Sequence, residues 1–306
     1  MKKIKIICVV GPTASGKSDL GVYLAKNLGG EIISADSMQV YKGMSVATAA
    51  VTQEEMQGVP HHLVEILDPS QRFSVADFIT QATQAVKEIT GRNHTPFIVG
   101  GTGLFADSFI NNITFSDVGV NTALRQELEQ KTNDELYEEL LRLDEKAAAD
   151  IHKNNRKRVI RAIELCKGGI TKTQQNENSR LIESPYDALY IGINYQDRER
   201  LYERINKRID IMLKNGLVDE AKFALKNAGP TSAQAIGHKE LAPYFNGSMT
   251  LDEAVENLKR ETRRYAKRQI TWFRRNENIN WLYADSMNKD ELYAEALSLA
   301  KDFLSQ

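Results

Sequence analysis

An apolar run at residues 4–10 leads directly into a glycine-rich segment that ends in lysine and serine. The segment reads Gly11-Pro12-Thr13-Ala14-Ser15-Gly16-Lys17-Ser18. This spacing is typical of a phosphate-binding loop, in which backbone N–H groups and a helix N-terminus point at a phosphate chain. A strand at 4–10 and a helix at 17–28 provide the context that such a loop requires. The segment therefore predicts a phosphate or diphosphate site, without indicating which molecule carries the phosphate.

Strands and helices alternate along the N-terminal part of the chain. Strands are expected at 31–34, 61–67 and 96–99, and a helix at 74–90. This alternation predicts an α/β fold, with a P-loop NTPase-like core built on a mainly parallel sheet. In such sheets ligands bind beyond the carboxyl ends of the strands, where the loop, Asp36 and residues 100–103 all lie.

The character of the chain changes near residue 116. Helices are expected at 123–143 and 155–166, and the polar stretch 171–184 is expected to be loop. Strands return at 188–195 and 279–284, with a long helix at 252–275 between them. The predicted organisation is a first part of the core at 1–115, a helical insertion at 116–186, and a return to the core with a basic helix at 187–306.

Composition limits the class of protein. The 306 residues are 42% hydrophobic, and no run approaches the ~20 apolar residues needed to cross a bilayer. The N-terminus has no signal-peptide cleavage site, and Cys8 and Cys166 do not have the spacing of metal ligands. We therefore expect a cytoplasmic protein with two reduced thiols and no membrane partner.

The net charge of −1 hides a segregation of basic residues. One cluster lies at 153–161, and a second lies on the helix at 252–275. At ~100° per residue, that helix has an apolar face and a basic face. The first consists of Val255, Leu258, Thr262, Tyr265, Ala266, Gln269, Trp272 and Phe273, and the second of Lys259, Arg260, Arg263, Arg264, Lys267, Arg268, Arg274 and Arg275. With only Glu256 and Glu261 nearby, the basic face favours contact with a phosphate backbone over a solvated surface.

Several segments, taken in order, resemble the bacterial tRNA dimethylallyltransferase family, also called tRNA isopentenyltransferases. Besides the loop they are Ser34-Ala35-Asp36-Ser37-Met38-Gln39-Val40-Tyr41, Pro60-His61-His62-Leu63, Gly100-Gly101-Thr102-Gly103-Leu104, Arg158 with Arg161-Ala162-Ile163-Glu164, Arg204-Ile205 with Arg208, Met212-Leu213 with Gly216-Leu217, and Ala266-Lys267-Arg268-Gln269-Ile270-Thr271-Trp272. The resemblance covers nearly the whole chain. It departs from the family at Gly237-His238-Lys239, where an aromatic residue often follows the glycine, so His238 is expected to pack or contact RNA rather than to catalyse.

The resemblance implies transfer of a dimethylallyl group from its diphosphate to N6 of adenosine at position 37 of tRNA, with Mg²⁺ as cofactor. The loop would hold the diphosphate through the backbone N–H groups of residues 13–18, Lys17 and Arg208, with Ser18 toward Mg²⁺. Asp36 would act as general base, and Thr102 would contact the substrate. The residues implied to bind the tRNA anticodon stem-loop are Asp36, Ser37, Met38, Gln39, Thr102, Lys157, Arg158, Arg161, Arg263, Lys267 and Arg268. We expect a monomeric enzyme.

Three other functions share parts of this pattern. A P-loop kinase would have the same loop, but here the strand at 96–99 runs into Gly100-Gly101-Thr102 instead of an aspartate that assists Mg²⁺ binding. An isopentenyltransferase acting on free adenine nucleotides would leave the basic clusters unexplained. A non-catalytic RNA-binding protein would leave the loop and Asp36 unexplained.

Overall fold

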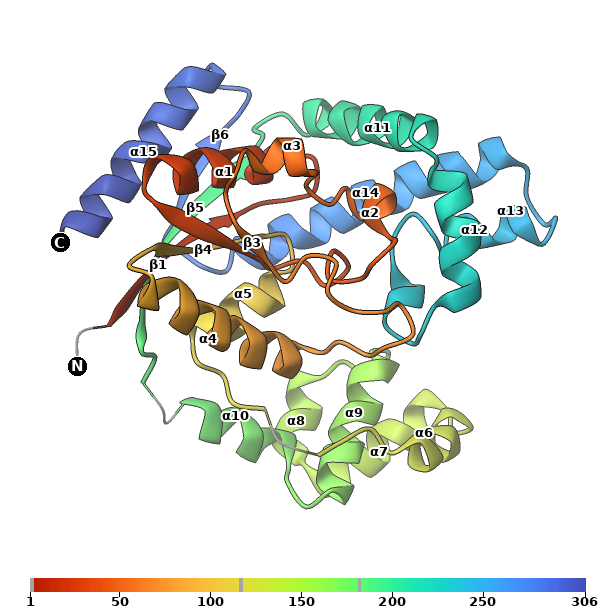
Figure 1. Ribbon diagram of the computed structural model, residues 1–306. Coiled ribbons are helices and arrows are strands. Elements are labelled where there is room, and N and C mark those ends of the chain that lie inside the picture. The colour runs from red at the N-terminus through yellow and green to blue at the C-terminus, as the bar shows by residue number, and fades with distance from the viewer. Residues whose placement is uncertain (1–2, 116–117, 181–182) are drawn as a thin grey trace. The chain divides into compact units, whose positions relative to one another are not determined.

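The computed structural model describes residues 3–115, 118–180 and 183–306 (Figure 1). The chain forms two compact units, one made of Met1–Ile110 with Pro185–Gln306 and the other of Asn111–Ser184. The sequence placed the corresponding boundaries at 116 and 186. Among the described residues, no helix has the length and apolar character needed to cross a membrane.

The first unit is built on a six-stranded sheet in which every strand pair is parallel, in the order β3-β2-β4-β1-β5-β6. The strands are β1 (Ile4–Val10), β2 (Gly30–Ser34), β3 (His61–His62), β4 (Thr95–Gly100), β5 (Tyr186–Asn194) and β6 (Ile279–Tyr283). The predicted α/β class is confirmed. The strand expected at 61–67 is wrong in length, because positive φ angles at Leu63 and Glu65 take the backbone out of the extended conformation.

Helices cover both faces of this sheet (Figure 1). The helices of this unit are α1 (Lys17–Asn27), α2 (Ser45–Thr48), α3 (Gln53–Met56), α4 (Val75–Gly91), α5 (Gly103–Ile110), α11 (Arg198–Lys214), α12 (Leu217–Asn227), α13 (Ala242–Phe245), α14 (Leu251–Phe273) and α15 (Lys289–Ser305), with a 3₁₀ turn at Ser232–Gln234. Residues of β1 alternate between the two faces: Cys8 packs with α4 and α5, whereas Ile7 and Val9 pack with α1 and α15. This burial on both sides explains the uninterrupted apolar run that precedes the loop.

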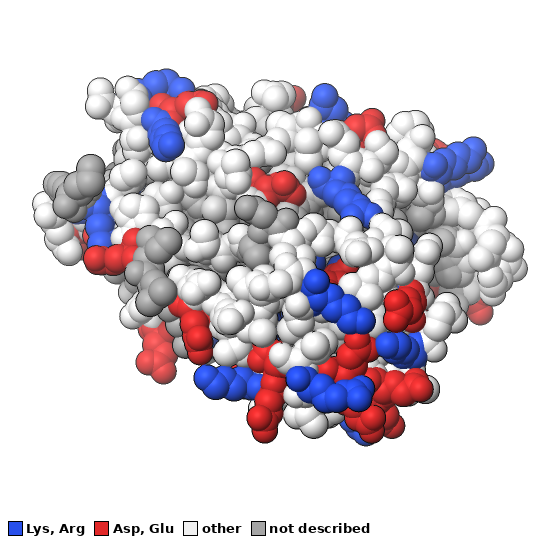
Figure 2. All heavy atoms as spheres, turned by 90° about the horizontal axis from the view of Figure 1, so that it is seen from below, with Lys and Arg blue, Asp and Glu red and all other residues white. Residues whose placement is uncertain are grey.

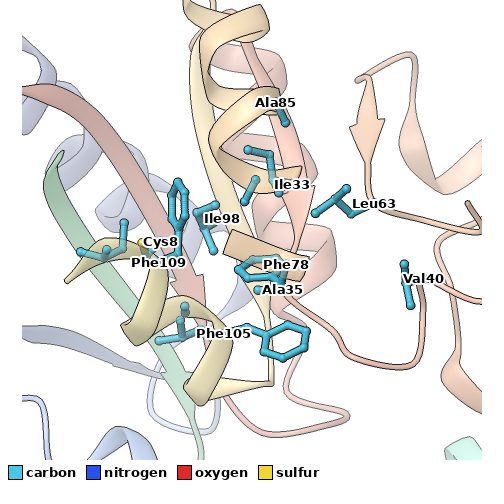
Figure 3. Packing of buried hydrophobic residues seen from close by; sticks show 14 of the residues in the cluster. Cys8, Ile33, Ala35, Val40, Leu63, Phe78, Ala85, Ile98, Phe105 and Phe109 are labelled. Carbon is cyan, nitrogen blue, oxygen red and sulfur yellow. The ribbon is translucent and has the colours of Figure 1, made fainter. Parts of the chain in front are cut away.

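The core beside α5 is aromatic. Phe78 of α4 stacks on Phe105 of α5 with ring centroids 4.6 Å apart, and Phe109 lies 6.2 Å from Phe78 with its ring edge-on. Figure 3 shows these three rings packed with Cys8 and Ile98 of the central strands. The packing fixes the start of α5, which directly follows Thr102.

The second unit is a helical cluster whose core is formed by leucine, isoleucine, valine and alanine side chains. Its helices are α6 (Thr122–Glu129), α7 (Asn133–Leu143), α8 (Glu145–Asp150), α9 (Arg156–Lys167) and α10 (Lys172–Arg180). Two expectations were wrong here. The single helix at 123–143 is divided because Thr132 and Glu135 form a capping box that starts a new helix. The expected loop at 171–184 contains α10, because Thr171 and Gln174 cap each other's backbone N–H groups in the same manner.

Candidate active site

The phosphate loop connects β1 to α1 and is held by its own backbone and by α14. The ammonium of Lys17 donates to the carbonyl of Pro12 at 3.4 Å. The Thr13 N–H donates to Gln269 Oε1 at 2.9 Å, and the Ser15 N–H donates to the Pro12 carbonyl at 3.3 Å. Two of the N–H groups expected to bind phosphate are therefore already engaged, which narrows the donors to those of Ala14 and residues 16–18.

Two cations lie close together beside the loop. Burial and, to a smaller extent, the neighbouring Arg208 of α11 lower the pKa of Lys17, while Asp36 raises it, and the net result is a pKa of about 8. Burial also lowers the pKa of Arg208, and Asp36 is the largest influence that raises it. Two neighbouring positive charges in a partly desolvated place favour binding of an anion that neutralises both.

Arg204 has a different position from its neighbour Arg208, one helical turn away. Its Nε donates to the carbonyl of Ala14 at 2.9 Å, and its guanidinium lies over the ring of Tyr195 at 5.7 Å from the centroid. Arg204 thus holds the backbone of the phosphate loop at Ala14.

Of the cavities that adjoin the loop, two share lining residues and lie toward Lys17 and Asp36. The larger, about 640 Å³, is lined by Lys17, Ser18 and Arg208 among others. The smaller, about 150 Å³, contains Asp36 and Tyr265 together with a mainly apolar wall formed by Met38, Ile205, Ile209, Met212, Ile236 and Leu258. Ala14, Arg208 and Met212 line both cavities, so the phosphate loop and Asp36 border neighbouring spaces.

Asp36 follows the end of β2 and is oriented by the backbone after it. Its Oδ1 accepts the N–H of Met38 at 2.9 Å and that of Gln39 at 3.4 Å. The Thr102 hydroxyl accepts the N–H of Ser37 at 3.2 Å, which joins the end of β2 to the loop after β4. The structure therefore brings Asp36, Ser37 and Thr102 together, as the sequence predicted for residues at neighbouring strand ends.

Gln39, also predicted to contact tRNA, has its side chain engaged within the protein. Its Oε1 accepts from the Ser34 hydroxyl at 2.9 Å, and its Nε2 donates to the carbonyls of Thr48 and Ala49 at 3.3 Å each. This amide holds the chain after β2 against the end of α2.

Helix α14 supplies site residues that the sequence analysis assigned only to an apolar face. The Tyr265 hydroxyl is hydrogen-bonded to Thr102, and its pKa is raised by burial, so it remains protonated. Gln269 is 5% exposed and bonds both Thr13 and the carbonyl of Gly101. Trp272 Nε1 donates to Asp107 Oδ2 at 2.6 Å. A glutamine on a buried helix face needs hydrogen-bond partners, and that requirement was the available signal in the sequence.

Two glycines after β4 make room for this helix. A Cβ atom on Gly101 would lie 2.2 Å from Gln269 Nε2, and one on Gly103 would lie 2.1 Å from Trp272 Cδ1. The segment around Thr102 therefore needs glycine because a buried helix passes close to it.

The basic face of α14 is partly neutralised. Lys259 pairs with Asp210 of α11 at 3.0 Å, an acidic neighbour that the expectation of only Glu256 and Glu261 had omitted. Arg263 donates to Asn206 Oδ1 at 2.8 Å. Lys267 and Arg268 are exposed. Of the three α14 residues predicted to bind tRNA, these last two have the more accessible side chains.

The basic cluster of the second unit is also divided. Lys157 and Arg158 are exposed at the start of α9. Arg161 donates to the carbonyl of Val118 at 2.8 Å and lies 3.4 Å from Glu164, which is buried. Arg161 therefore compensates a buried carboxylate. On the face of the molecule shown in Figure 2, acidic and basic side chains lie among one another.

His238 is 1% exposed, and its ring contacts a carboxylate. Its Nε2 lies 2.8 Å from Glu220 Oε1, and Glu220 also accepts the N–H groups of Val46 and Ala47 at the start of α2. Of the two expectations for this residue, packing is the one that the structure bears out, because a buried ring cannot contact RNA.

The chain is similar to known proteins over nearly its whole length. The family model described as IPP transferase matches residues 39–276, and one described as isopentenyl transferase matches residues 4–70. A tRNA dimethylallyltransferase of Halalkalibacterium halodurans is 48% identical over 301 residues, which cover 96% of this chain and 95% of the relative. This chain belongs to the tRNA dimethylallyltransferase family.

Other members of the tRNA dimethylallyltransferase family agree with this assignment. The tRNA dimethylallyltransferase of Clostridioides difficile is 45% identical, with 99% of both chains covered. The crystal structure of a tRNA isopentenylpyrophosphate transferase from Bacillus halodurans superposes with a TM-score of 0.75 at 45% identity, covering 99% of this chain and 97% of that one. A eukaryotic dimethylallyltransferase captured acting on tRNA gives a TM-score of 0.83 at 29% identity, covering 99% and 80%. The family predicted from the sequence is confirmed, and the chain is a prenyl-transferring enzyme.

Proposed function

We propose that this enzyme transfers the dimethylallyl group of dimethylallyl diphosphate to N6 of adenosine at position 37 in the anticodon stem-loop of tRNA, releasing diphosphate. The observation that carries the proposal is the pair of neighbouring cavities. One is bordered by the phosphate loop, and the other, of about 150 Å³, contains Asp36 beside an apolar wall. This arrangement suits a substrate with an anionic end and an apolar end.

The diphosphate side provides most of the catalysis in this proposal. The allylic carbon gains positive charge as the C–O bond to diphosphate breaks, and the leaving group gains negative charge. Lys17, Arg208 and the free N–H groups of the loop would stabilise that developing charge. Preorganised donors of this kind are commonly the largest catalytic contribution.

On the acceptor side, Asp36 would take the proton that N6 loses as the new C–N bond forms. Its Oδ1 is held by two backbone N–H groups, so the carboxylate is oriented before the substrate arrives. Thr102 and Ser37, which are hydrogen-bonded to each other beside Asp36, would contact the adenine edge. A stacked base cannot reach this cavity, so the adenosine would be flipped out of the anticodon loop.

The residues at the loop fit a Mg²⁺ ion that arrives with the diphosphate. Among the described residues no group of three His, Cys, Asp or Glu side chains is placed to hold a metal ion. Mg²⁺ is commonly bound through one or two protein groups together with phosphate oxygens and water. The Ser18 hydroxyl, which lines the larger cavity, would be the protein ligand, and the ion would offset charge on the diphosphate.

For tRNA binding we propose Lys267 and Arg268 of α14 and Lys157 and Arg158 of α9, all exposed. Cations of this kind contact the phosphate backbone and place the RNA without reading its sequence.

The test is to incubate the purified protein and Mg²⁺ with unmodified tRNA and radiolabelled dimethylallyl diphosphate, with AMP as an alternative acceptor. Label in tRNA and none in AMP is expected, and nuclease digestion should place it on one adenosine. A tRNA whose position 37 is guanosine is the matched control. Label in AMP would instead indicate prenylation of free nucleotides, and label in neither acceptor would contradict the proposal.

A further inference from the structure

We infer that Gln269 is a positioning residue that couples tRNA binding on α14 to the diphosphate site. The inference rests on the proposed function and adds to it a physical link between the two substrates. Gln269 touches neither reacting atom. It acts through Thr13 of the phosphate loop and Gly101 of the loop that carries Thr102.

Gln269 is hydrogen-bonded to the Tyr265 side chain of its own helix and, across to the two loops, through two further bonds. Its Oε1 accepts the Thr13 N–H at 2.9 Å, and its Nε2 donates to the Gly101 carbonyl at 2.9 Å. Because one partner is a donor and the other an acceptor, a reversed amide would lose both bonds. A single buried side chain thus fixes the spacing between two loops that follow different strands, β1 and β4.

Three residues on one side of α14 contact consecutive parts of the site. Tyr265 bonds to Thr102, Gln269 bonds to Thr13 and Gly101, and Trp272 packs on Gly103 and bonds to Asp107. With a rise of 1.5 Å per residue, these contacts extend over about 10 Å of helix. Helix α14 therefore contacts the phosphate loop, the loop after β4 and the start of α5.

The exposed cations of the same helix lie between these contacts in sequence. Lys267 and Arg268 fall within the turn that precedes Gln269, and Arg268 also lies over the ring of Tyr265 at 5.6 Å from the centroid. A phosphate bound to these cations would fix α14, and through Gln269 it would fix the phosphate loop. By linkage, tRNA should tighten diphosphate binding, and diphosphate should tighten tRNA binding by the same factor.

The test compares Gln269→Met, which keeps the size of the side chain and removes its hydrogen bonds to both loops, with Gln269→Glu, which keeps the acceptor for Thr13 and loses the donor to Gly101. Ser232→Ala is the matched control, because Ser232 is also buried and its hydroxyl donates to the Pro69 carbonyl at 2.6 Å away from both cavities. Binding of inorganic diphosphate is measured with and without the anticodon stem-loop. Steady-state kcat and KM and the melting temperature are measured for each variant.

For the unchanged protein we expect the stem-loop to tighten diphosphate binding at least about fivefold. Gln269→Met should abolish this tightening and lower kcat/KM for dimethylallyl diphosphate about tenfold to a hundredfold, as for other supporting groups. The affinity of the stem-loop measured alone should stay within about twofold, and Gln269→Glu should recover part of the loss. Ser232→Ala should lower the melting temperature and leave the tightening in place.

The inference is overturned if Gln269→Met retains the full tightening, or if its kinetic loss merely follows its melting temperature as in Ser232→Ala. Because the tightening is measured with inorganic diphosphate, it is independent of transfer. Failure of the unchanged protein to prenylate tRNA would overturn the proposed function, while the binding comparison would still decide the role of Gln269.

Discussion

Two carboxylates belonging to β2 and the segment after it have opposite surroundings. Glu31, near the amino end of the strand, is 2% exposed and is bonded to Arg92 through both its oxygens and to His62 and His94 at 2.7 Å each. Asp36, beyond the carboxyl end, is held through Oδ1 by two backbone N–H groups and lines a cavity. One carboxylate has a full set of partners, and the other is oriented and accessible.

The partners around each carboxylate decide whether it stabilises the fold or is available for catalysis. Hydrogen bonding to Arg92, with support from His62 and His94, lowers the pKa of Glu31 to about 2, so it stays ionised and unreactive. Asp36 faces Lys17 and Arg208, whose own pKa values respond to its charge. A general base must be able to approach its substrate. Asp36 lines a cavity beyond the carboxyl end of the strand, so a substrate can reach it, whereas Glu31 is buried among its partners.

Replacing Asp36 with alanine should have the largest effect on activity. We expect kcat to fall by about a thousandfold, the size of a general-base contribution, with little change in the affinity for the anticodon stem-loop. Single-turnover transfer and equilibrium RNA binding measure the two quantities. A large loss of RNA affinity with normal turnover would remove the base role and with it the contrast to Glu31.

Lys17→Met should lower kcat/KM for dimethylallyl diphosphate by about a hundredfold, since a developing negative charge loses one of the cations beside the loop. In the unchanged protein the pKa of Lys17 is lowered to about 8, so the free enzyme loses this positive charge as pH rises through that value. The KM for the diphosphate should therefore increase above about pH 8. Bound diphosphate stabilises the charged lysine, so kcat should change less. If the KM for dimethylallyl diphosphate in the unchanged protein does not vary from pH 7 to 9.5, the assignment of Lys17 to the diphosphate site is contradicted.

Glu31→Gln should reduce the free energy of unfolding by about 2 kcal/mol, because the buried carboxylate loses its charge-assisted hydrogen bonds to the partly exposed side chains of Arg92, His62 and His94. The pKa of this group is lowered on folding, so its stabilisation is complete above its ordinary pKa near 4.5 and is lost as pH falls toward about 2. Urea denaturation at pH 7 and at pH 3 should show a smaller difference between variant and unchanged protein at the lower pH. If the variant and the unchanged protein differ equally in stability at pH 7 and at pH 3, the charge of Glu31 is not the source of the stabilisation.

Lys267→Ala combined with Arg268→Ala should have the smallest effect, a loss of about tenfold in tRNA affinity. The slope of log affinity against log salt should decrease by about 0.9 for each phosphate contact removed. Lys301→Ala, an exposed lysine of α15, serves as the control with an unchanged slope. If the double variant also keeps its slope, this part of α14 is a solvated surface.

Much of the fold could be predicted because its signals are local. The apolar run into the phosphate loop predicted β1 and α1. The strand ends predicted that the segment at Asp36 and the loop that carries Thr102 would lie at one edge of the sheet, and the Ser37 N–H does donate to the Thr102 hydroxyl. The helix α10 was missed because a polar composition outweighed a capping pair that was present in the sequence.

What could not be predicted depends on partners distant in the chain. The engagement of the Thr13 N–H by Gln269 joins residues 256 positions apart, and no local pattern indicates it. Arg161 and Arg263 were expected to be available to RNA, but Arg161 donates to the carbonyl of Val118 and Arg263 donates to Asn206. Sequence patterns identified the types of group in the site, whereas tertiary packing decided which of them remain available to a substrate.

The most direct test of the account is to measure transfer and stability together in Asp36→Asn and Glu31→Gln. Single-turnover prenylation of tRNA is followed at a temperature where both variants are folded, and urea midpoints are recorded for the same preparations. We predict that Asp36→Asn keeps its midpoint and loses transfer, while Glu31→Gln loses stability and keeps transfer. An Asp36→Asn protein that prenylates tRNA at the unchanged rate would contradict the account.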